Sequence, residues 1–361
     1  METVNVGILY IGQVTKPCYA GCFESQEKYG VNLFAFTISD VDRKNKTING
    51  RFKDENGKTY RKIVGYPHVV CNQITYTSNP TYRDLKKHAK FTRSILVRDK
   101  IAKYKEEELS KSEFSDLVIP HHRIQRGADD ILDGLKTYGE VIIKPIASSL
   151  GLNVNLLRLD KEENRIYFKN EKGEKSFSAD DINENLTRIL KRHKSYILQP
   201  FRESVTKENQ PFDIRVFARR GRDGDFVTTA YTRVGRKDTI TSNITRGFGR
   251  PHLDVYGFLK ENFGEHADKL MLRLDYIREN LPRFYQSLYG KHKLVVIGID
   301  LGVAQTPDGP EFVMYEINMQ TVGANAIPEI NAEAMHGYFR YLYEELKSEQ
   351  EAKLKAKKSK E

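Results

Sequence analysis

Two short apolar strings near the C-terminal end of the sequence constrain the fold most. GIDLGV (298–303) and MYEIN (314–318) are separated by a Pro-Asp-Gly turn, which predicts a β-hairpin. Alternate residues of a strand point to the same face, so Glu316 and Asn318 share a face, and Asp300 lies near the facing stretch of the partner strand. Three oxygen donors on an apolar hairpin suit a hard cation such as Mg²⁺. The alternative is a solvated hairpin face with ordinary polar residues, although Asp and Asn are uncommon in strands.

The length and composition indicate two or three packed units. The chain has 361 residues, of which 39% are hydrophobic, and a domain takes roughly 150 residues. No apolar run reaches the ~18 residues of a membrane span, and the N-terminal sequence has no signal-peptide pattern. We therefore expect a cytoplasmic protein without a membrane partner. The three cysteines form no Cys-x-x-Cys and are expected to be reduced thiols.

The formal net charge of +10 predicts attraction to anions without choosing among them. Part of it comes from the basic tail 347–361, which is expected to be a solvated helical end. Nucleotides, nucleic acid and acidic polymers are all compatible with the rest. A short Arg-Gly segment at 242–251 could contact RNA, but it lacks aromatic stacking platforms, so a nucleic-acid partner is disfavoured.

The order of patterns along the chain predicts mixed α/β architecture. Strand patterns at 4–11 and 31–38 flank a helix at 22–29, and this β-α-β opening favours a parallel sheet. The polar segment 81–104 is compatible with a helix. Apolar residues at helical spacing predict a long helix over 267–288.

A lysine ends the apolar strand at 140–145 and precedes a polar loop. Lys144 cannot stay buried without a partner, so it emerges into solvent or meets an anion. Ser148, Ser149 and Gly151 offer hydroxyls and a flexible backbone that could fold over phosphate. A lysine whose ammonium simply reaches solvent explains the pattern as well.

A strand at 212–220 carries charges on one face. Asp213, Arg215 and Arg219 alternate there with apolar residues, and a structural ion pair and a contact to substrate or phosphate are both compatible with this pattern. Further downstream, polar side chains that suit phosphate and carboxylate gather around glycines; they are Arg233, Asn243, Arg246 and Arg250.

The order of these motifs resembles that of the ATP-grasp superfamily. Lys100 precedes the strand with Lys144, and then follow a Gln-Pro-Phe string, an Asp-x-Arg strand, an Asn/Arg loop and the Asp…Glu-x-Asn hairpin. The strings PFDIRVFARRGRDG, YTRVG, GIDLGV and YEIN look more closely like the YheC/YheD ATP-grasp family, which is associated with the spore coat. The resemblance covers most of the chain apart from the basic tail.

The resemblance implies an α/β and α+β protein in which two α+β subdomains clamp ATP, preceded by an N-terminal α/β pre-ATP-grasp domain. At the level of the family it also implies a spore-coat association. The implied boundaries are 1–95 for the N-terminal domain, 96–201 for the central or lid subdomain, 202–346 for the C-terminal subdomain with the metal site, and 347–361 for the tail.

It also implies a role for each candidate residue. ATP would be contacted at its phosphates, through a flexible loop and beside its adenine by Lys100, Lys144, Ser148, Ser149, Gly151, Gln199, Pro200, Phe201 and Asp213. One or two Mg²⁺ ions would be held by Asp300, Glu316 and Asn318. The phosphate and the reacting carboxylate would face Arg215, Arg233 and Arg246.

The implied reaction is ATP-dependent ligation of a small-molecule or peptide carboxylate to an amine through an acyl phosphate. It needs no protein nucleophile, and the sequence has no Ser or Cys catalytic pattern. A kinase-like ATP-grasp phosphotransferase and a catalytically degenerate structural protein of the spore coat are the alternatives. One departure from the family concerns 319–323, which lacks the proline that often follows Glu-x-Asn and therefore affects the acceptor-side loop. Neither substrate nor the oligomeric state is encoded in a readable pattern.

Overall fold

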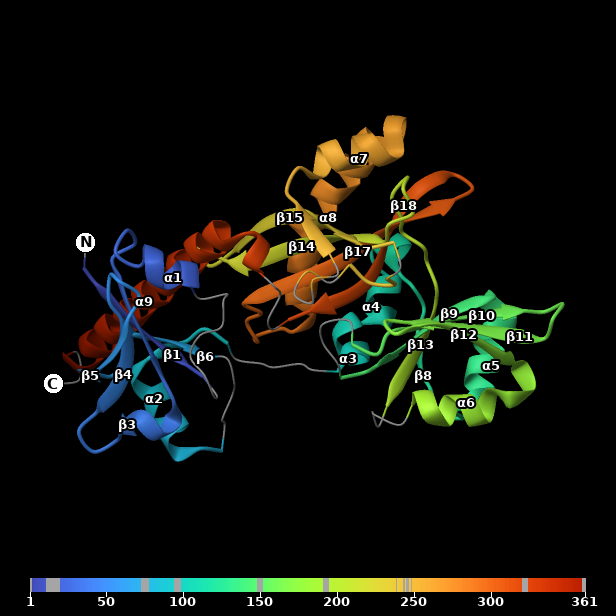
Figure 1. Ribbon diagram of the computed structural model, residues 1–361. Helices are drawn as coiled ribbons and strands as arrows, with labels where there is room; N and C mark the ends of the chain where they lie inside the picture. Colours follow the sequence, from blue (N-terminus) through green and yellow to red (C-terminus); the bar gives the residue numbers. More distant parts are fainter. Residues whose placement is uncertain are drawn as a thin grey trace.

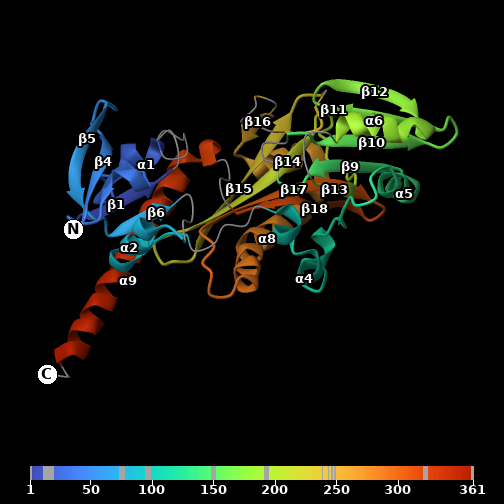
Figure 2. The same ribbon diagram turned by 90° about the horizontal axis from the view of Figure 1, so that it is seen from below.

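The protein contains three β-sheets that lie side by side (Figure 1). The computed structural model describes residues 2–10, 20–72, 78–93, 99–147, 152–190, 195–237, 239–242, 244, 247, 249–319 and 324–358. The sheet formed by the C-terminal part of the chain lies between the N-terminal sheet and the sheet of the middle segment, in both views of the ribbon (Figures 1 and 2). Within the described ranges, no helix combines the length and apolar character needed to cross a membrane.

The N-terminal sheet has the order β3-β4-β2-β1-β6-β7, with β5 paired to β4, and its strands β2, β1, β6 and β7 are mutually parallel. This confirms the predicted β-α-β opening. The elements are β1 (Val4–Leu9), α1 (Ala20–Ser25), β2 (Val31–Phe36), a 3₁₀ turn (Ile38–Asp40), β3 (Val41–Asp42), β4 (Thr47–Lys53), β5 (Thr59–Gly65), β6 (Val69–Asn72), α2 (Pro80–His88) and β7 (Lys90–Phe91). The segment 81–104, predicted to be compatible with a helix, instead contains most of α2, then β7 and a second short helix, because β7 extends the sheet beside β6.

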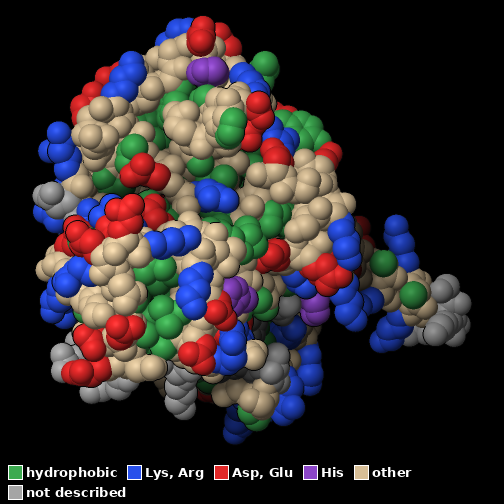
Figure 3. Space-filling model, turned by 90° about the vertical axis from the view of Figure 1, so that its right-hand side faces the viewer, with side chains coloured by type: hydrophobic (Ala, Val, Ile, Leu, Met, Phe, Trp, Pro, Cys, Tyr) green, Lys and Arg blue, Asp and Glu red, His purple; other side chains and the backbone are tan. Residues whose placement is uncertain are grey.

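The last helix of the chain packs on this first sheet. Helix α9 (Pro328–Lys358) contributes Met335, Phe339 and Leu342 to a core that also contains apolar residues of β1, β2 and α1. The two ends of the chain therefore lie in one unit (Figure 1). The end of α9 projects from the body and carries basic side chains, as Figures 2 and 3 show. The predicted helical tail is thus the continuation of a longer packed helix.

A buried histidine joins α9 to α1 and makes stability depend on pH. His336 is fully buried; its Nε2 lies 3.0 Å from the Cys22 carbonyl oxygen, and its ring stacks on Tyr29. Burial lowers the pKa of His336 from 6.5 to about 4. Between about pH 6.5 and pH 4 His336 is therefore protonated in the unfolded chain but neutral in the native protein. The free energy of unfolding falls as the pH falls from 6.5 towards 4.

We expect this loss to reach about 3 kcal/mol over that range, since each pKa unit corresponds to about 1.4 kcal/mol. Urea unfolding at a series of pH values would measure it in the wild type and in His336→Phe. In the variant, the free energy of unfolding should depend less steeply on pH, by the contribution of the histidine, whatever its stability at neutral pH. An unchanged slope would contradict the assignment.

The middle segment forms an antiparallel sheet of order β12-β11-β10-β9-β13-β8, and α5 and α6 share its core. Its elements are β8 (His122–Arg123), α5 (Ala128–Tyr138), β9 (Glu140–Pro145), β10 (Asn155–Asp160), β11 (Arg165–Asn170), β12 (Gly173–Ser178), a 3₁₀ turn (Ala179–Asp181), α6 (Ile182–Ile189) and β13 (Tyr196–Pro200). Three short helical pieces precede it; they are α3 (Lys100–Tyr104), α4 (Glu106–Ser110) and a 3₁₀ turn (Ser115–Leu117).

The C-terminal segment forms an antiparallel sheet of order β16-β15-β14-β17-β18. Its elements are β14 (Phe212–Arg220), β15 (Phe226–Gly235), β16 (Gly249–His252), α7 (Val255–Phe263), a 3₁₀ turn (Gly264–His266), α8 (Ala267–Leu288), β17 (Val296–Thr306), β18 (Gly309–Asn318) and a 3₁₀ turn (Ala324–Ala326). The predicted hairpin (β17 and β18) and the predicted helix over 267–288 are both confirmed. One face of the sheet packs on α8 through Ile214, Ile299 and Met314, among others, so the polar side chains of these strands gather on the opposite face.

Candidate active site

A row of charged residues crosses three neighbouring strands on the face opposite α8. Arg215 on β14 is directly opposite Asp300 on β17, and Asp300 is directly opposite Glu316 on β18. Residues directly opposite one another in an antiparallel pair share a face, so this row follows from the strand register alone. Asp213 lies on the same face of β14, two residues before Arg215, and is opposite Arg233 on β15.

The ion pairs of this row join residues of different strands. The sequence allowed a pair within the strand 212–220, Asp213 with Arg215, but each of these residues is held by a partner from another strand. The Arg215 guanidinium holds both oxygens of Asp300, with Nη2 donating to Oδ2 at 2.9 Å. Arg233 forms a two-pronged contact with Asp213 at 2.5 Å and reaches Asp300 Oδ1 at 2.9 Å. Burial acts to raise the pKa of the Asp300 carboxyl, but the two guanidinium groups outweigh burial and hold that pKa below its usual range.

Glu316 lies among lysines from two other parts of the chain. Lys100 Nζ donates to Glu316 Oε2 at 3.0 Å, and Lys144 on β9 donates to the backbone carbonyl of Tyr315 at 3.0 Å. Burial acts to raise the pKa of Glu316, but Lys100, Lys144 and Lys103 lower it below the usual range. Burial lowers the pKa of Lys144 to about 8. Cations outnumber carboxylates here, as a site for a polyanion requires.

A β-bulge in β18 decides which way Glu316 points. Phe312 and Met314 face the core against α8, and an unbroken alternation would send Glu316 there too. The register shifts by one residue between Asp300 and Leu301, whose partners are Glu316 and Met314, so Tyr315 is the extra residue. The bulge reverses the alternation; Ile317 then enters the core, and Glu316 faces Asp300.

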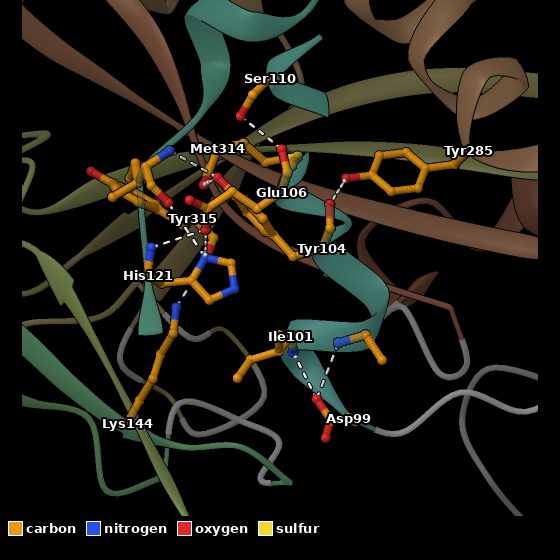
Figure 4. A network of polar contacts seen from close by, with 12 residues as sticks. Asp99, Ile101, Tyr104, Glu106, Ser110, His121, Lys144, Tyr285, Met314 and Tyr315 are labelled. Carbon is orange, nitrogen blue, oxygen red and sulfur yellow. Dashed lines mark hydrogen bonds and ion pairs between the residues drawn. The ribbon is translucent and has the colours of Figure 1, made fainter. Parts of the chain in front are cut away.

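Side chains from outside the sheet satisfy the carbonyls at this bulge (Figure 4). The Tyr104 hydroxyl of α3 donates to the Met314 carbonyl at 2.9 Å, and Lys144 Nζ donates to that of Tyr315. The Tyr315 hydroxyl in turn donates to the Arg202 carbonyl at 2.7 Å. The ring passes over Gly302, where an added Cβ would lie 2.2 Å from the Tyr315 hydroxyl oxygen, so a glycine is needed there. The bulge is therefore the point where α3, β9 and β18 are joined.

The Gln-Pro-Phe string lies on the sheet that carries Lys144. Gln199 is buried, and its backbone pairs with Ile142 of β9, while Ile197, two residues earlier, is opposite Lys144. Gln199 and Lys144 therefore share one face of this sheet. Pro200 ends β13, and the Phe201 amide donates to the Glu140 carbonyl. Lys144 and the Gln-Pro-Phe string therefore lie on two paired strands, β9 and β13. A single nucleotide site that uses both would need this arrangement.

Asn318 follows Glu316 on the same face of β18 and is opposite Gly298. Five of the predicted polar or loop residues lie outside the described part of the chain; they are Ser148, Ser149, Gly151, Asn243 and Arg246. The sequence reasoning also overlooked a residue that the structure brings to the site, Lys103, which is 6% exposed. Burial lowers the pKa of Lys103, and the negative charges of Glu316, Asp300 and Asp99 oppose that shift. The spacing of three between Lys103 and Lys100 on a helix was the available signal.

The donor set fits Mg²⁺ by its chemistry. Asp300, Glu316 and Asn318 offer only oxygen ligands, from directly opposed or alternate positions on one face. The net shift of the Glu316 pKa is downward, and burial and the negative charge of Asp300 oppose it, so the two carboxylates interact. Across the described part of the chain no cluster of three or more His, Cys, Asp and Glu gathers, so an amide such as Asn318 would be needed to complete a protein triad.

Comparison with known proteins assigns the chain to a family. The model of the YheC/D-like ATP-grasp family matches residues 90–342, and the chain belongs to that family. Among solved structures it is similar to D-alanyl-alanine synthetase A from Vibrio cholerae, with 12% identity, 95% of this chain and 98% of that chain covered and a TM-score of 0.50. D-cycloserine synthetase DcsG has 13% identity, coverage of 93% and 99% and a TM-score of 0.49. No curated protein matches the sequence. The fold is that of ATP-grasp proteins.

Proposed function

We propose that this chain is an ATP-dependent, Mg²⁺-dependent ligase that joins a carboxylate to an amine and releases ADP. The observation that carries the proposal is the convergence of three lysines and two arginines from three sheets or helices on one row of carboxylates. That convergence creates a buried, cationic site with oxygen donors at its centre, which suits a metal-bound triphosphate. Membership of the ATP-grasp family supports the same nucleotide.

The reaction proceeds in two steps. A carboxylate oxygen of the first substrate attacks the terminal phosphorus of ATP, ADP leaves with the bonding electrons, and an acyl phosphate forms. An amine nitrogen then attacks the acyl carbon, the carbon–oxygen bond to phosphate breaks, and an amide, phosphate and a proton result. Both steps bring anions together, so fixed positive charge is what the protein must supply.

The residues divide this work. Lys100 and Lys144 would lie along the phosphates, with Ser148, Ser149 and Gly151 over them. The adenine would lie beside Gln199, Pro200 and Phe201, and Asp213 would hold Arg233 in place. Arg215, Arg233 and Arg246 would face the transferred phosphate and the reacting carboxylate. One or two Mg²⁺ ions held by Asp300, Glu316 and Asn318 would supply Lewis-acid stabilisation of the phosphoryl group.

The test is a screen of pooled carboxylates against pooled amines, with ADP release as the signal and mass spectrometry of the product. We expect ADP and an amide only when both pools are present. A stable phosphorylated product that forms without any amine would show a phosphotransferase instead. Absence of ADP from every pool, together with absence of nucleotide binding, would indicate a structural protein.

The pKa of Lys144 predicts how nucleotide affinity depends on pH. Its ammonium is charged below about pH 8 and loses its proton as the pH rises through that value, so binding of a non-hydrolysable ATP analogue should weaken. We expect about tenfold weaker binding at alkaline pH, comparable to the loss of one charged hydrogen bond. Lys144→Arg keeps its charge throughout, and its affinity should stay level. Equal pH profiles of the two proteins would contradict this role.

A further inference from the structure

Two buried hydrogen-bond donors without a partner lie together in the N-terminal unit, outside the charged row of the candidate active site. Tyr10 directly follows β1 and is 3% exposed, and Arg51 is on β4. Within the described part of the chain, the Tyr10 hydroxyl and the Arg51 Nε are buried and have no hydrogen-bond partner. The Arg51 guanidinium carbon lies 5.9 Å from the centroid of the Tyr10 ring. Buried donors are nearly always satisfied in native proteins, so two neighbouring exceptions require an explanation.

Positive charge is in excess around these two donors. The face of β4 that carries Arg51 also carries Lys53, and Arg61 of β5 is directly opposite Arg51. Like charges at directly opposed positions destabilise a pair of strands. Asp40 accepts a hydrogen bond from Arg61 at 2.9 Å, and the Lys53 ammonium lies 5.7 Å from the centroid of the Phe23 ring. Arg51 has no ion-pair partner among the described residues, so the pair of arginines is neutralised on one side only.

Both unsatisfied groups call for an acceptor with negative charge. Burial raises the pKa of the Tyr10 phenol, although the positive charges of Arg51 and Arg61 oppose that shift. The phenol therefore keeps its proton at neutral pH and offers an O–H, while a guanidinium has only donors and stays charged. A carboxylate or a phosphate has several acceptor oxygens, and a guanidinium can hold two of them at once. One such anion would satisfy both donors.

The two donors lie at the edge where parallel α/β sheets bind ligands. The Tyr10 amide donates to the carbonyl of Phe36, the last residue of β2, so both residues lie at the carboxyl ends of parallel strands. Strands β2 and β6 both follow β1 in sequence, yet they lie on opposite sides of it. Ligands of open α/β sheets bind beyond the carboxyl ends of the strands, where the strand order reverses in this way. The chain leaves the same edge after β7 and next forms α3, which carries Lys100 of the candidate active site.

We propose that Arg51 and Tyr10 bind an anionic group, a carboxylate or a phosphate, of one of the two substrates. The assignment of this anion to a substrate rests on the proposed function. The carboxylate that reacts would lie at the terminal phosphate of ATP, beside Arg215 and Asp300, and so in a different part of the molecule. The group held by Arg51 is therefore a second anionic group, and the substrate class is one that carries a carboxylate or a phosphate apart from its reacting group.

Binding of the isolated anions tests this site without turnover. Malonate and inorganic phosphate are titrated into the full chain by calorimetry, with Mg²⁺ and an excess of an imido analogue of ATP present. For the anion that binds more tightly, Arg51→Met should weaken binding by about 10-fold or more, the loss of a charged hydrogen bond. Tyr10→Phe should weaken it by about 2- to 10-fold, the loss of a neutral one. The tighter anion identifies the bound group as a carboxylate or a phosphate.

Lys62→Met is the matched control for these variants. Lys62 is exposed on the same hairpin, and it faces away from Arg51 because it follows Arg61 on β5. This variant removes the same charge and should bind both anions as the wild type does. Tyr10→Phe keeps the buried ring and removes one oxygen, so it tests the site even if Arg51→Met does not fold.

Turnover gives a second readout for any substrate pair found in the ADP-release screen. Arg51→Met should raise the KM of the substrate with the second anionic group by about 10-fold and change kcat by less than about threefold, as expected for a group bound away from the reacting atoms. A wild type that binds neither anion, or variants of Arg51 and Tyr10 that bind them as the wild type does, would overturn the site. Anion binding that Arg51→Met removes, without ADP formation from any pool, would support the site and count against the proposed function. ADP formation without anion binding would leave the proposed function and remove the site.

Discussion

Replacement of Glu316 by glutamine is expected to lower the rate of ADP formation by about 10³-fold or more, because it removes charge at the centre of the site. The Glu316 carboxylate lies 3.0 Å from Lys100 Nζ and is on the same face of the sheet as Asp300 and Asn318. A glutamine has nearly the same shape, so it should leave the fold intact. It has no charge with which to hold Mg²⁺.

The same variant should bind metal-free ATP at least as tightly as the wild type, since a negative charge beside the phosphates is gone. ADP release with a full set of substrates and calorimetry without metal would measure the two effects. Glu311→Gln is the matched control, because Glu311 is exposed on the same strand. Retained turnover in Glu316→Gln would exclude the assignment of Glu316 as a metal ligand. Weaker binding of metal-free ATP would show that the Glu316 charge does not lie beside the phosphates.

Replacement of Arg215 by methionine is expected to destabilise the protein by about 3–5 kcal/mol, the range for breaking a buried ion pair on one side. Arg215 is buried and holds both oxygens of Asp300. Among the described residues, the ion-pair contact that Asp300 then keeps comes from Arg233, which also holds Asp213. Urea unfolding of the nucleotide-free protein would measure the change in free energy.

The double variant Arg215→Met with Asp300→Leu should recover most of this loss, because it replaces a buried pair by apolar side chains and leaves Arg233 on Asp213. Arg215→Lys should not recover it, since an ammonium cannot hold both carboxylate oxygens in the same plane. A single variant that costs less than about 1 kcal/mol would show that Arg233 alone satisfies Asp300.

Much of the candidate site could be predicted because it depends on the period of single strands. Alternation along 212–220 placed Asp213 and Arg215 on one face, and the Pro-Asp-Gly turn paired β17 with β18. The partners of these charges could not be predicted. Arg215 pairs with Asp300 of a different strand, and Asp213 with Arg233, because the register between strands sets which side chains meet.

Two further features depend on contacts between distant parts of the chain. Lys103 gains its place only because α3 approaches β18. Helix α9 follows the C-terminal sheet in sequence, yet packs on the first sheet, where it buries the apolar residues of β1 and α1. Neither contact has a local signal in the sequence, since long-range packing rather than propensity decides where a short or amphipathic helix docks.

The sequence by itself determined the hairpin, the oxygen donors on it and the order of basic residues that the family shares. The tertiary structure decided which way Glu316 faces. With unbroken alternation from Phe312 and Met314, Glu316 would enter the core beside α8. The extra residue Tyr315 turns it to Asp300 instead, and Tyr104 and Lys144 satisfy the carbonyls at the bulge. A bulge of one residue is set by such donors from other elements, and the strand's own sequence does not specify it.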